Sequence, residues 1–359
     1  MVTRNPETSE SSNVGALATS GLLPSNYESV VARFALLRAS VFVVAYAIAY
    51  VFASRLIRFA LLMAIGRSGK LTSLWQIGWP RSGWFWQVPH KETVINAPDI
   101  AVGAVIGLAS IAFLTCSATA FEGHIRWFIG LGKRQFSGFF IGAMTGLISM
   151  SLLVSFLHFM GCINLSSRAD GVQSLLYGCL WLMVYFAVGT LEECLFHGYP
   201  QYALTRGLRA FGSLISTRYA RQVAFWIAAT LLSTAFAAAH LRNSGESLIG
   251  IVSVFVLGMV SSYALWRTGS LWWSVGFHGL WDWTQSFLLG VPDSGALSAG
   301  RLVQTASHGP AYLSGASVGP EGSLLAIPAL LLAVLLVRWT TQSRIGERES
   351  AQLLSDVGL

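Results

Sequence analysis

Charged residues are scarce in this sequence. They make up 11% of its 359 residues, whereas hydrophobic residues make up 54%. An ordinary soluble domain has about 25% charged residues. A soluble globule of this length could not bury so much apolar surface and keep a charged coat. The composition therefore argues against a soluble enzyme, a disordered protein and a nucleic-acid-binding protein, and predicts an all-α polytopic membrane protein.

Cysteines are also few, and none has the CxxC spacing of a metal site: Cys116, Cys162, Cys179 and Cys194. A disulfide framework or a zinc–thiolate site is therefore not expected. The net charge of +7 would suggest nucleic acid in a soluble protein. Here the basic residues lie mostly between apolar runs, as the positive-inside rule requires, so no nucleic-acid partner is predicted.

Long apolar runs dominate the chain. Because a bilayer core needs about 20 helical residues, the sequence predicts about eight transmembrane helices in one bundle. They are residues 36–58, 100–121, 136–160, 173–195, 222–241, 247–266, 270–290 and 323–339. The distribution of Lys and Arg favours a multi-pass topology with both termini in the cytoplasm.

The predicted spans and the polar segments between them divide the chain into five parts. We expect a flexible polar tail (1–28), N-terminal transmembrane helices (29–170), a membrane core (171–290), an exposed Gly-, Ser- and Pro-rich loop (291–322), and the last transmembrane helix with the C-terminal tail (323–359). Within the core, the arginine-rich stretch 199–221 is typical of an amphipathic interfacial helix.

Glycines recur at spacings that let helices approach closely. Gly138, Gly142 and Gly146 are four residues apart, as are Gly103 and Gly107. Small residues at this spacing indicate close packing between membrane helices rather than a functional site.

Ionisable side chains inside the predicted spans are rare and concentrated. Each costs roughly 2.5–3.5 kcal/mol on insertion scales, so it needs a reason. The spans hold the carboxylates Glu192, Glu193 and Asp282, and His197, His240 and His278 lie near them. This concentration predicts a functional cavity, although polar groups that only stabilise the bundle are the alternative.

The spacing of these residues places them on shared helix faces. Glu193 and His197 are four residues apart, as are Phe236 and His240, and His278 and Asp282. Three helices can therefore direct polar side chains into one interior. Carboxylates beside imidazoles can deprotonate a water molecule or hold a metal ion that does so.

In their order, the three clusters resemble the motifs of the CPBP family of intramembrane proteases, also called the Abi or CAAX-protease-like family. The motifs EExxxR, FxxxH and HxxxN or HxxxD are matched by Glu192 to His197, Phe236 to His240 and His278 to Asp282. The resemblance covers roughly 185–290. It implies that Glu192 activates the attacking water with help from His240. It also implies that His278 and Asp282 orient the site or stabilise the oxyanion, and that Glu193 supports them.

Two points stay open at this stage. The cofactor is either absent or a divalent metal such as zinc, for which Glu193, His197, His240 and His278 are the candidate ligands. The arginine of the first motif is His197 here, and histidine does not reproduce the bidentate, permanently charged guanidinium. It would either brace Glu193, or mark a changed substrate preference or a loss of activity.

With these span boundaries, His240 and Glu192 fall near opposite sides of the membrane. A shared site therefore requires the fifth span to begin before residue 222 or to tilt inward at its end.

The resemblance predicts an intramembrane endopeptidase that acts on a membrane protein or a lipidated peptide in the lipid bilayer. A non-catalytic scaffold or bacteriocin-immunity relative is the first alternative. An ion-coupled transporter is the second, because transporters also concentrate Glu, Asp and His at mid-membrane.

Overall fold

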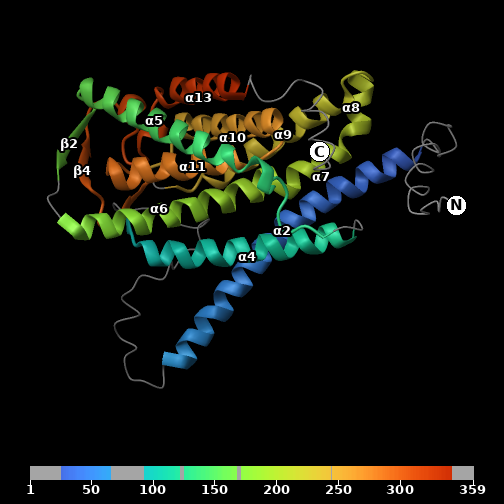
Figure 1. Ribbon diagram of the computed structural model, residues 1–359, viewed down its shortest axis with the longest axis horizontal. Coiled ribbons are helices and arrows are strands. Elements are labelled where there is room, and N and C mark those ends of the chain that lie inside the picture. Colours follow the sequence, from blue (N-terminus) through green and yellow to red (C-terminus); the bar gives the residue numbers. More distant parts are fainter. Residues whose placement is uncertain (1–25, 66–92, 122–124, 168–170, 244, 342–359) are drawn as a thin grey trace, which may run out of the picture.

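The computed structural model describes residues 26–65, 93–121, 125–167, 171–243 and 245–341. It is a bundle of roughly aligned helices that α2 crosses obliquely (Figure 1). Its longer helices are α2 (Asn26–Ile65), α4 (Ala97–Phe121), α5 (Ser137–Phe159), α6 (Gly171–Glu193), α9 (Ala220–Ala239) and α10 (Leu248–Thr268). Its shorter helices are α7 (Tyr199–Gly207), α8 (Arg209–Ile215), α11 (Trp272–Trp283), α12 (Ala311–Ser314) and α13 (Ala326–Thr341).

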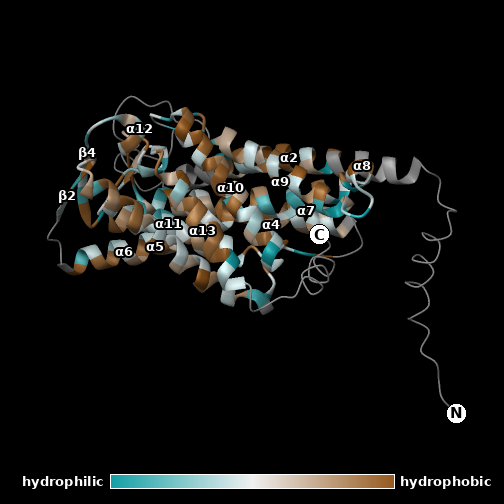
Figure 2. Ribbon diagram, turned by 90° about the horizontal axis from the view of Figure 1, so that it is seen from above, coloured by the Kyte–Doolittle hydropathy of each residue, from teal (hydrophilic) through white to brown (hydrophobic). Residues whose placement is uncertain are grey.

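Hydrophobic residues predominate along the helices, as Figure 2 shows. Among the described residues, six helices are long and apolar enough to cross a membrane, which confirms the all-α polytopic membrane fold. The count of eight is not confirmed. The seventh predicted span is the 12-residue α11 followed by a π-helical turn, Thr284–Leu288, and the eighth is the 16-residue α13.

The fourth predicted span is longer than the sequence indicated. After α6 the chain continues through a π-helical turn, Cys194–Gly198, into α7, so one apolar helix runs over residues 172–207. Pro200 lies in the first turn of α7. Proline lacks an N–H and its ring clashes with the carbonyl four residues earlier, so the widened turn lies where an α-helical hydrogen bond cannot form.

The prediction of one amphipathic interfacial helix over 199–221 is therefore wrong. Nearly all of α7 is buried, whereas α8 exposes the large apolar side chains of Phe211, Leu214 and Ile215. The arginines that suggested an interfacial helix do not share one helix: Arg206 is on α7, Arg209 on α8, Arg218 in the turn after α8 and Arg221 at the start of α9.

Glycines set the closest helix contact in the bundle. A Cβ on Gly142 would overlap the carbonyl oxygen of Trp273, and a Cβ on Gly276 would overlap that of Phe139. The backbones of α5 and α11 therefore meet directly, as the glycine spacing predicted. Gly146 has a similar contact with Phe277, whereas Gly138 has more room, because the nearest atom to its Cβ position is 3.6 Å away.

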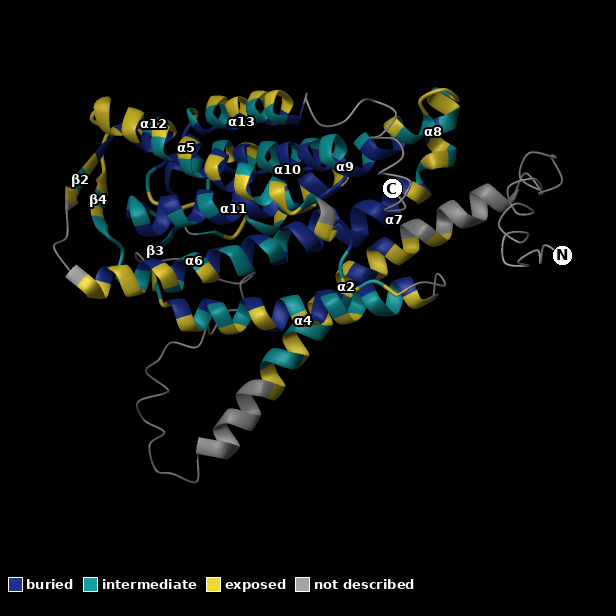
Figure 3. Ribbon diagram, in the orientation of Figure 1, coloured by how far each residue is buried: buried dark blue, intermediate teal, exposed yellow. Residues whose placement is uncertain are grey.

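The segment 291–322 differs from the exposed loop that was predicted. It contains β3 (Ala296–Ser298) and β4 (Val303–Ser307), which pair with β1 (Thr93–Ile95) and β2 (Ile163–Ser167), respectively. Val291 and Val318 are fully buried, while residues 306–312 are exposed. Figure 3 shows the buried residues concentrated where α6, α9, α10 and α11 meet. Most of the predicted tails, 1–25 and 342–359, lies outside the described residues.

Candidate active site

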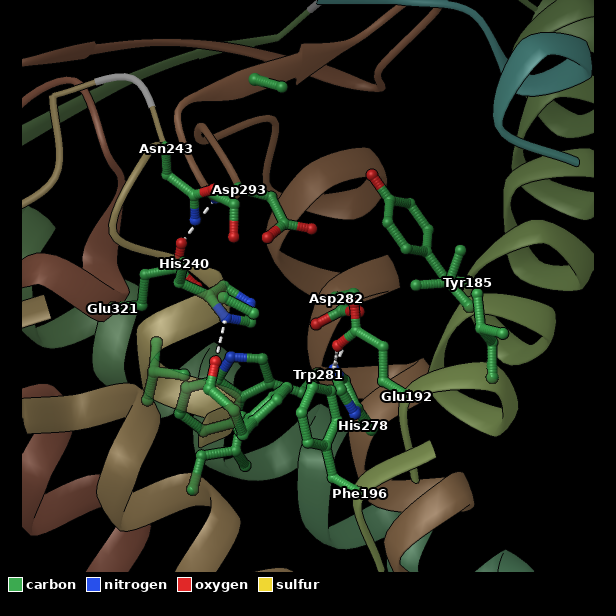
Figure 4. Close-up of a pocket in the computed structure, with 18 of the residues that line it drawn as sticks. Tyr185, Glu192, Phe196, His240, Asn243, His278, Trp281, Asp282, Asp293 and Glu321 are labelled. Carbon is green, nitrogen blue, oxygen red and sulfur yellow. Dashed lines mark hydrogen bonds and ion pairs between the residues drawn. The ribbon is translucent and has the colours of Figure 1, made fainter. Parts of the chain in front are cut away.

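One cavity of about 140 Å³ collects residues from all three predicted clusters. Its lining includes Glu192 of α6, His240 at the end of α9, and His278 and Asp282 of α11. In Figure 4, Glu192, Asp282 and His278 lie close together, with His240 beside them. Since a water molecule occupies about 30 Å³ in the liquid, this volume suffices for a reacting water and its neighbours.

The predicted spans placed Glu192 and His240 near opposite sides of the membrane, but the structure brings them together because the fourth span is longer than predicted. Glu192 lies well inside the apolar helix 172–207 rather than at its end. The helix α9 begins at Ala220, close to the predicted start, and its C-terminal end meets α6 at this level. The boundary of the fourth span, and not the start or tilt of the fifth, caused the apparent conflict.

Glu193 faces away from the cavity and binds three other side chains. Its Oε1 accepts a hydrogen bond from Ser261 Oγ at 3.0 Å and lies 3.1 Å from His278 Nδ1. Its Oε2 lies 3.0 Å from His197 Nδ1. The residue is only 1% exposed. A buried carboxylate needs such partners, because an uncompensated charge would be costly at this depth.

The contact with Glu193 sets the orientation of His278. A carboxylate accepts hydrogen bonds, so Nδ1 carries the proton in this contact. The other nitrogen, Nε2, faces the cavity, 3.4 Å from Glu192 Oε2 and 3.6 Å from Asp282 Oδ2. His278 thus joins the buried Glu193 to the two carboxylates of the cavity.

His240 is held by the backbone of its own helix. Its Nδ1 lies 2.8 Å from the carbonyl oxygen of Phe236, so this nitrogen donates and Nε2 remains the acceptor of a neutral ring. The Phe236 ring packs at 4.8 Å, centroid to centroid, from the His240 ring and at 6.1 Å from the His278 ring. Phe236 therefore spaces the two imidazoles.

His197, which replaces the motif arginine, does not line the cavity. It is 2% exposed and contacts Glu193 from the π-helical turn. The position therefore braces the second glutamate and offers no surface to a substrate. Of the two uses proposed for this residue, the geometry supports the first.

Several polar residues of the cavity escaped the sequence analysis. Asp293 and Glu321 line it from the segment 291–322, and Arg242 and Asn243 line it from the turn after α9. Ser286 Oγ donates to Asp293 Oδ2 at 2.9 Å, and the backbone N–H of Ser294 donates to Glu321. Carboxylates in a Gly- and Pro-rich segment are ordinarily solvated, so no pattern in the sequence marks these two.

Burial changes the acidity of both carboxylates. It raises the pKa of Asp293 to about 6, although the Ser286 hydroxyl lowers the pKa in part. Burial also raises the pKa of Glu321 well above its ordinary value, and the nearby Asp293 adds to this effect. Asp293 therefore changes charge near pH 6, and Glu321 keeps its proton to higher pH than an ordinary glutamate.

The candidate metal ligands do not assemble into a metal site. Within the residues that the structure describes, no group of three His, Cys, Asp or Glu side chains is arranged to hold an ion. Glu193 and His197 contact each other outside the cavity lining, so they cannot join the cavity-facing Nε2 atoms of His240 and His278 around one ion. These side chains do not fit a bound metal ion in this arrangement.

The cavity combines two kinds of wall. The motif residues form a polar wall, and aliphatic and aromatic side chains form another, including Ile100, Val188 and Leu257. Such a site can hold water beside an apolar segment of a substrate. Carboxylates and imidazoles around the water are suited to general acid–base chemistry.

Comparison with known proteins identified one protein family whose model matches the part of the chain that forms this cavity. Residues 174–284 match the family model described as Type II CAAX prenyl endopeptidase Rce1-like. The match covers less than half of the chain but includes all three motifs. None of the curated proteins and none of the solved structures matched the chain. The match confirms the resemblance to CAAX-protease-like membrane enzymes of the CPBP family, and an integral membrane protease is the function that this family implies.

Proposed function

We propose that this CAAX-protease-like membrane enzyme hydrolyses a peptide bond with a water molecule activated by Glu192. The observation that supports the proposal most strongly is the division of the adjacent glutamates. Glu192 faces the cavity together with His240, His278 and Asp282, whereas Glu193 lies behind them, enclosed by protein donors. The first glutamate can therefore meet water, and the second can hold the first motif against His278.

In this proposal the Glu192 carboxylate takes a proton from water, and the resulting hydroxide attacks the carbonyl carbon of the peptide bond. The tetrahedral intermediate bears an oxyanion, which accepts a hydrogen bond from His278 Nε2. Glu192 then transfers its proton to the departing nitrogen as the C–N bond breaks. The Nε2 atom of His240 accepts a hydrogen bond from the water and orients it.

Asp282 has a positioning role in the proposal. It lies one helical turn from His278 and 3.6 Å from its Nε2. A carboxylate at this position favours a proton on Nε2, which the oxyanion interaction needs. Asp282 also keeps a second carboxylate beside Glu192, and this proximity supports proton transfer between them.

We propose a membrane protein or a lipidated peptide as the substrate class. The cavity lies within a bundle of apolar helices, and its aliphatic wall adjoins the motif residues. An apolar segment delivered from the bilayer would contact this wall while its scissile bond meets the water. We also propose that both termini lie in the cytoplasm, from the distribution of Lys and Arg, and that residues 171–290 form the catalytic core.

The experiment is a comparison of protein termini in native membranes that contain the wild type or Glu192→Gln at equal abundance. We expect new termini with the wild type only, because glutamine cannot accept the proton. Asp99→Asn, which removes a carboxylate in the first turn of α4, is the control and should give the wild-type profile.

Identical profiles for the wild type and Glu192→Gln, with both proteins folded, would contradict the protease proposal and favour a scaffold or immunity protein. Proton or solute flux in vesicles that Glu192→Gln abolishes would instead favour a transporter.

A further inference from the structure

The corner formed by α8 and the start of α9 has an unusual charge composition. Between Tyr199 and Ala239 the chain contains no Asp or Glu, but it contains Arg206, Arg209, Arg218 and Arg221. Arg206, Arg209 and Arg218 are exposed, and the charges of Arg209 and Arg221 are close enough to repel each other. We call these four residues the arginine corner. Positive charges that lie close together attract an anion.

The N-terminus of α9 lies in the same corner. This helix begins at Ala220, immediately between Arg218 and Arg221 in the chain, and its N-cap residue Tyr219 makes no side-chain capping bond. The first backbone N–H groups of a 20-residue helix carry partial positive charge. The helix end thus adds to the field of the arginines.

An apolar groove continues from the corner along the outer face of α9. Ile215, Tyr219, Val223, Trp226, Ile227 and Leu231 line it. Leu231 is 51% exposed, and Leu214 and Ile215 of α8 are 82% and 61% exposed. Figure 3 shows α8 as an exposed element at one end of the bundle, next to α9. Since α9 is one of the helices that can span a membrane, its exposed face lies against acyl chains.

We propose that the arginine corner and this groove bind one anionic phospholipid. Its phosphate lies at Arg218, Arg221 and the N-terminus of α9, and one acyl chain follows the groove toward the middle of the bundle. Two observations support this ligand class together: positive charge concentrates where a headgroup would lie, and the apolar groove begins beside it. An anionic lipid satisfies both parts, whereas a soluble anion satisfies only the first.

The test uses the full-length protein, purified in detergent and freed of lipid. Dioleoyl phosphatidylglycerol and dioleoyl phosphatidylcholine are titrated separately, and binding is measured by native mass spectrometry and by thermal unfolding. We expect tighter binding of the anionic lipid. Arg218→Gln combined with Arg221→Gln should weaken its binding roughly 30-fold, about fivefold per arginine, and leave phosphatidylcholine binding unchanged.

Two further variants separate the contribution of the arginine charges to lipid binding from the contribution of the apolar groove. Lys133→Gln combined with Arg338→Gln removes the same charge from exposed positions elsewhere and should change binding by less than about twofold. Thr230→Trp places a large side chain at an exposed position that lines the groove. It should weaken the binding of both lipids. If the double arginine variant does not fold, Arg209→Gln tests the same charge in a single substitution.

Three results would overturn the proposal. The first is equal affinity for the two lipids. The second is an equal loss in the Lys133 and Arg338 control, which would indicate attraction to the overall charge of the protein. The third is unchanged lipid binding in Thr230→Trp, which would indicate a site for a bare phosphate group. All readouts are independent of proteolysis.

Discussion

The Nδ1 atom of His278 lies 3.1 Å from Oε1 of Glu193, a residue 85 positions earlier in the chain. This contact joins α6 to α11 behind the cavity and turns His278 Nε2 toward Glu192 and Asp282. The adjacent glutamates therefore differ in their contacts: Glu193 holds the imidazole of His278, and Glu192 lines the cavity. His197, Ser261 and the glycines of α5 provide tests of this arrangement and of the packing around it, and Asp293 provides a test of the buried carboxylates in segment 291–322.

His197 should influence catalysis only through Glu193. We expect His197→Ala to cost about 1–3 kcal/mol of stability, because it leaves the buried Glu193 Oε2 without its neighbour. We also expect it to lower kcat while KM stays unchanged, because His197 does not line the cavity. His197→Gln keeps a hydrogen-bond donor and should lose less stability and less kcat than His197→Ala. Thermal unfolding and peptide cleavage measure the two effects. A raised KM with an unchanged kcat would show that His197 contacts substrate instead.

Ser261 should contribute measurably to the position of Glu193. Ser261→Ala removes its hydrogen bond to Oε1, and we expect a loss of about 1 kcal/mol in unfolding free energy with a smaller fall in kcat. Ser262→Ala is the matched control. It is fully buried, and its hydroxyl has no hydrogen-bond partner among the described residues. Equal losses in both variants would indicate that the Ser261 contact is without special importance.

The α5–α11 contact should tolerate no added methyl group at its centre. A Cβ on Gly142 would overlap the Trp273 backbone, so we expect Gly142→Ala to cost about 3 kcal/mol or to prevent accumulation of folded protein. Gly138→Ala, with 3.6 Å to the nearest atom, should be neutral or stabilising, since alanine favours helices. Abundance in membranes and thermal unfolding decide between these outcomes. Similar behaviour of the two variants would contradict the direct backbone contact.

Asp293 should make stability depend on pH. Its pKa is about 6 in the folded protein and about 3.9 in an unfolded chain. Between these values the folded state binds more protons, so its contribution to stability is complete below about pH 4 and is lost as the pH rises through 6. We therefore expect the melting temperature of the wild type, relative to Asp293→Asn, to fall from pH 4.5 to 6.5 and then level off.

A second variant checks the origin of this pH dependence. Ser286→Ala removes a donor that lowers the Asp293 pKa, so the fall should move to higher pH. If the difference in melting temperature between the wild type and Asp293→Asn is the same at every pH, Asp293 does not titrate in this range.

Local patterns were enough to locate the motifs. The four-residue spacings of Glu193 and His197, and of His278 and Asp282, gave side-chain contacts because the helical period brings such residues together. The glycines of α5 were recognised as packing residues for the same reason. Helix ends were harder to predict. The fourth span was predicted to end at residue 195, yet the helix continues through a π-helical turn into the buried α7.

The amino-acid composition alone required a membrane bundle, since so few charges cannot cover so much apolar surface. The concentration of ionisable residues in the predicted spans, together with the resemblance to the family motifs, pointed to Glu192, His240, His278 and Asp282. Packing between distant segments determined the rest. It directed Glu192 toward the cavity and Glu193 toward Ser261 and His278, and it buried Asp293 and Glu321 against the same cavity. The physical reason is that a side chain's neighbours on its own helix follow from spacing, whereas its neighbours on other helices depend on how those helices meet.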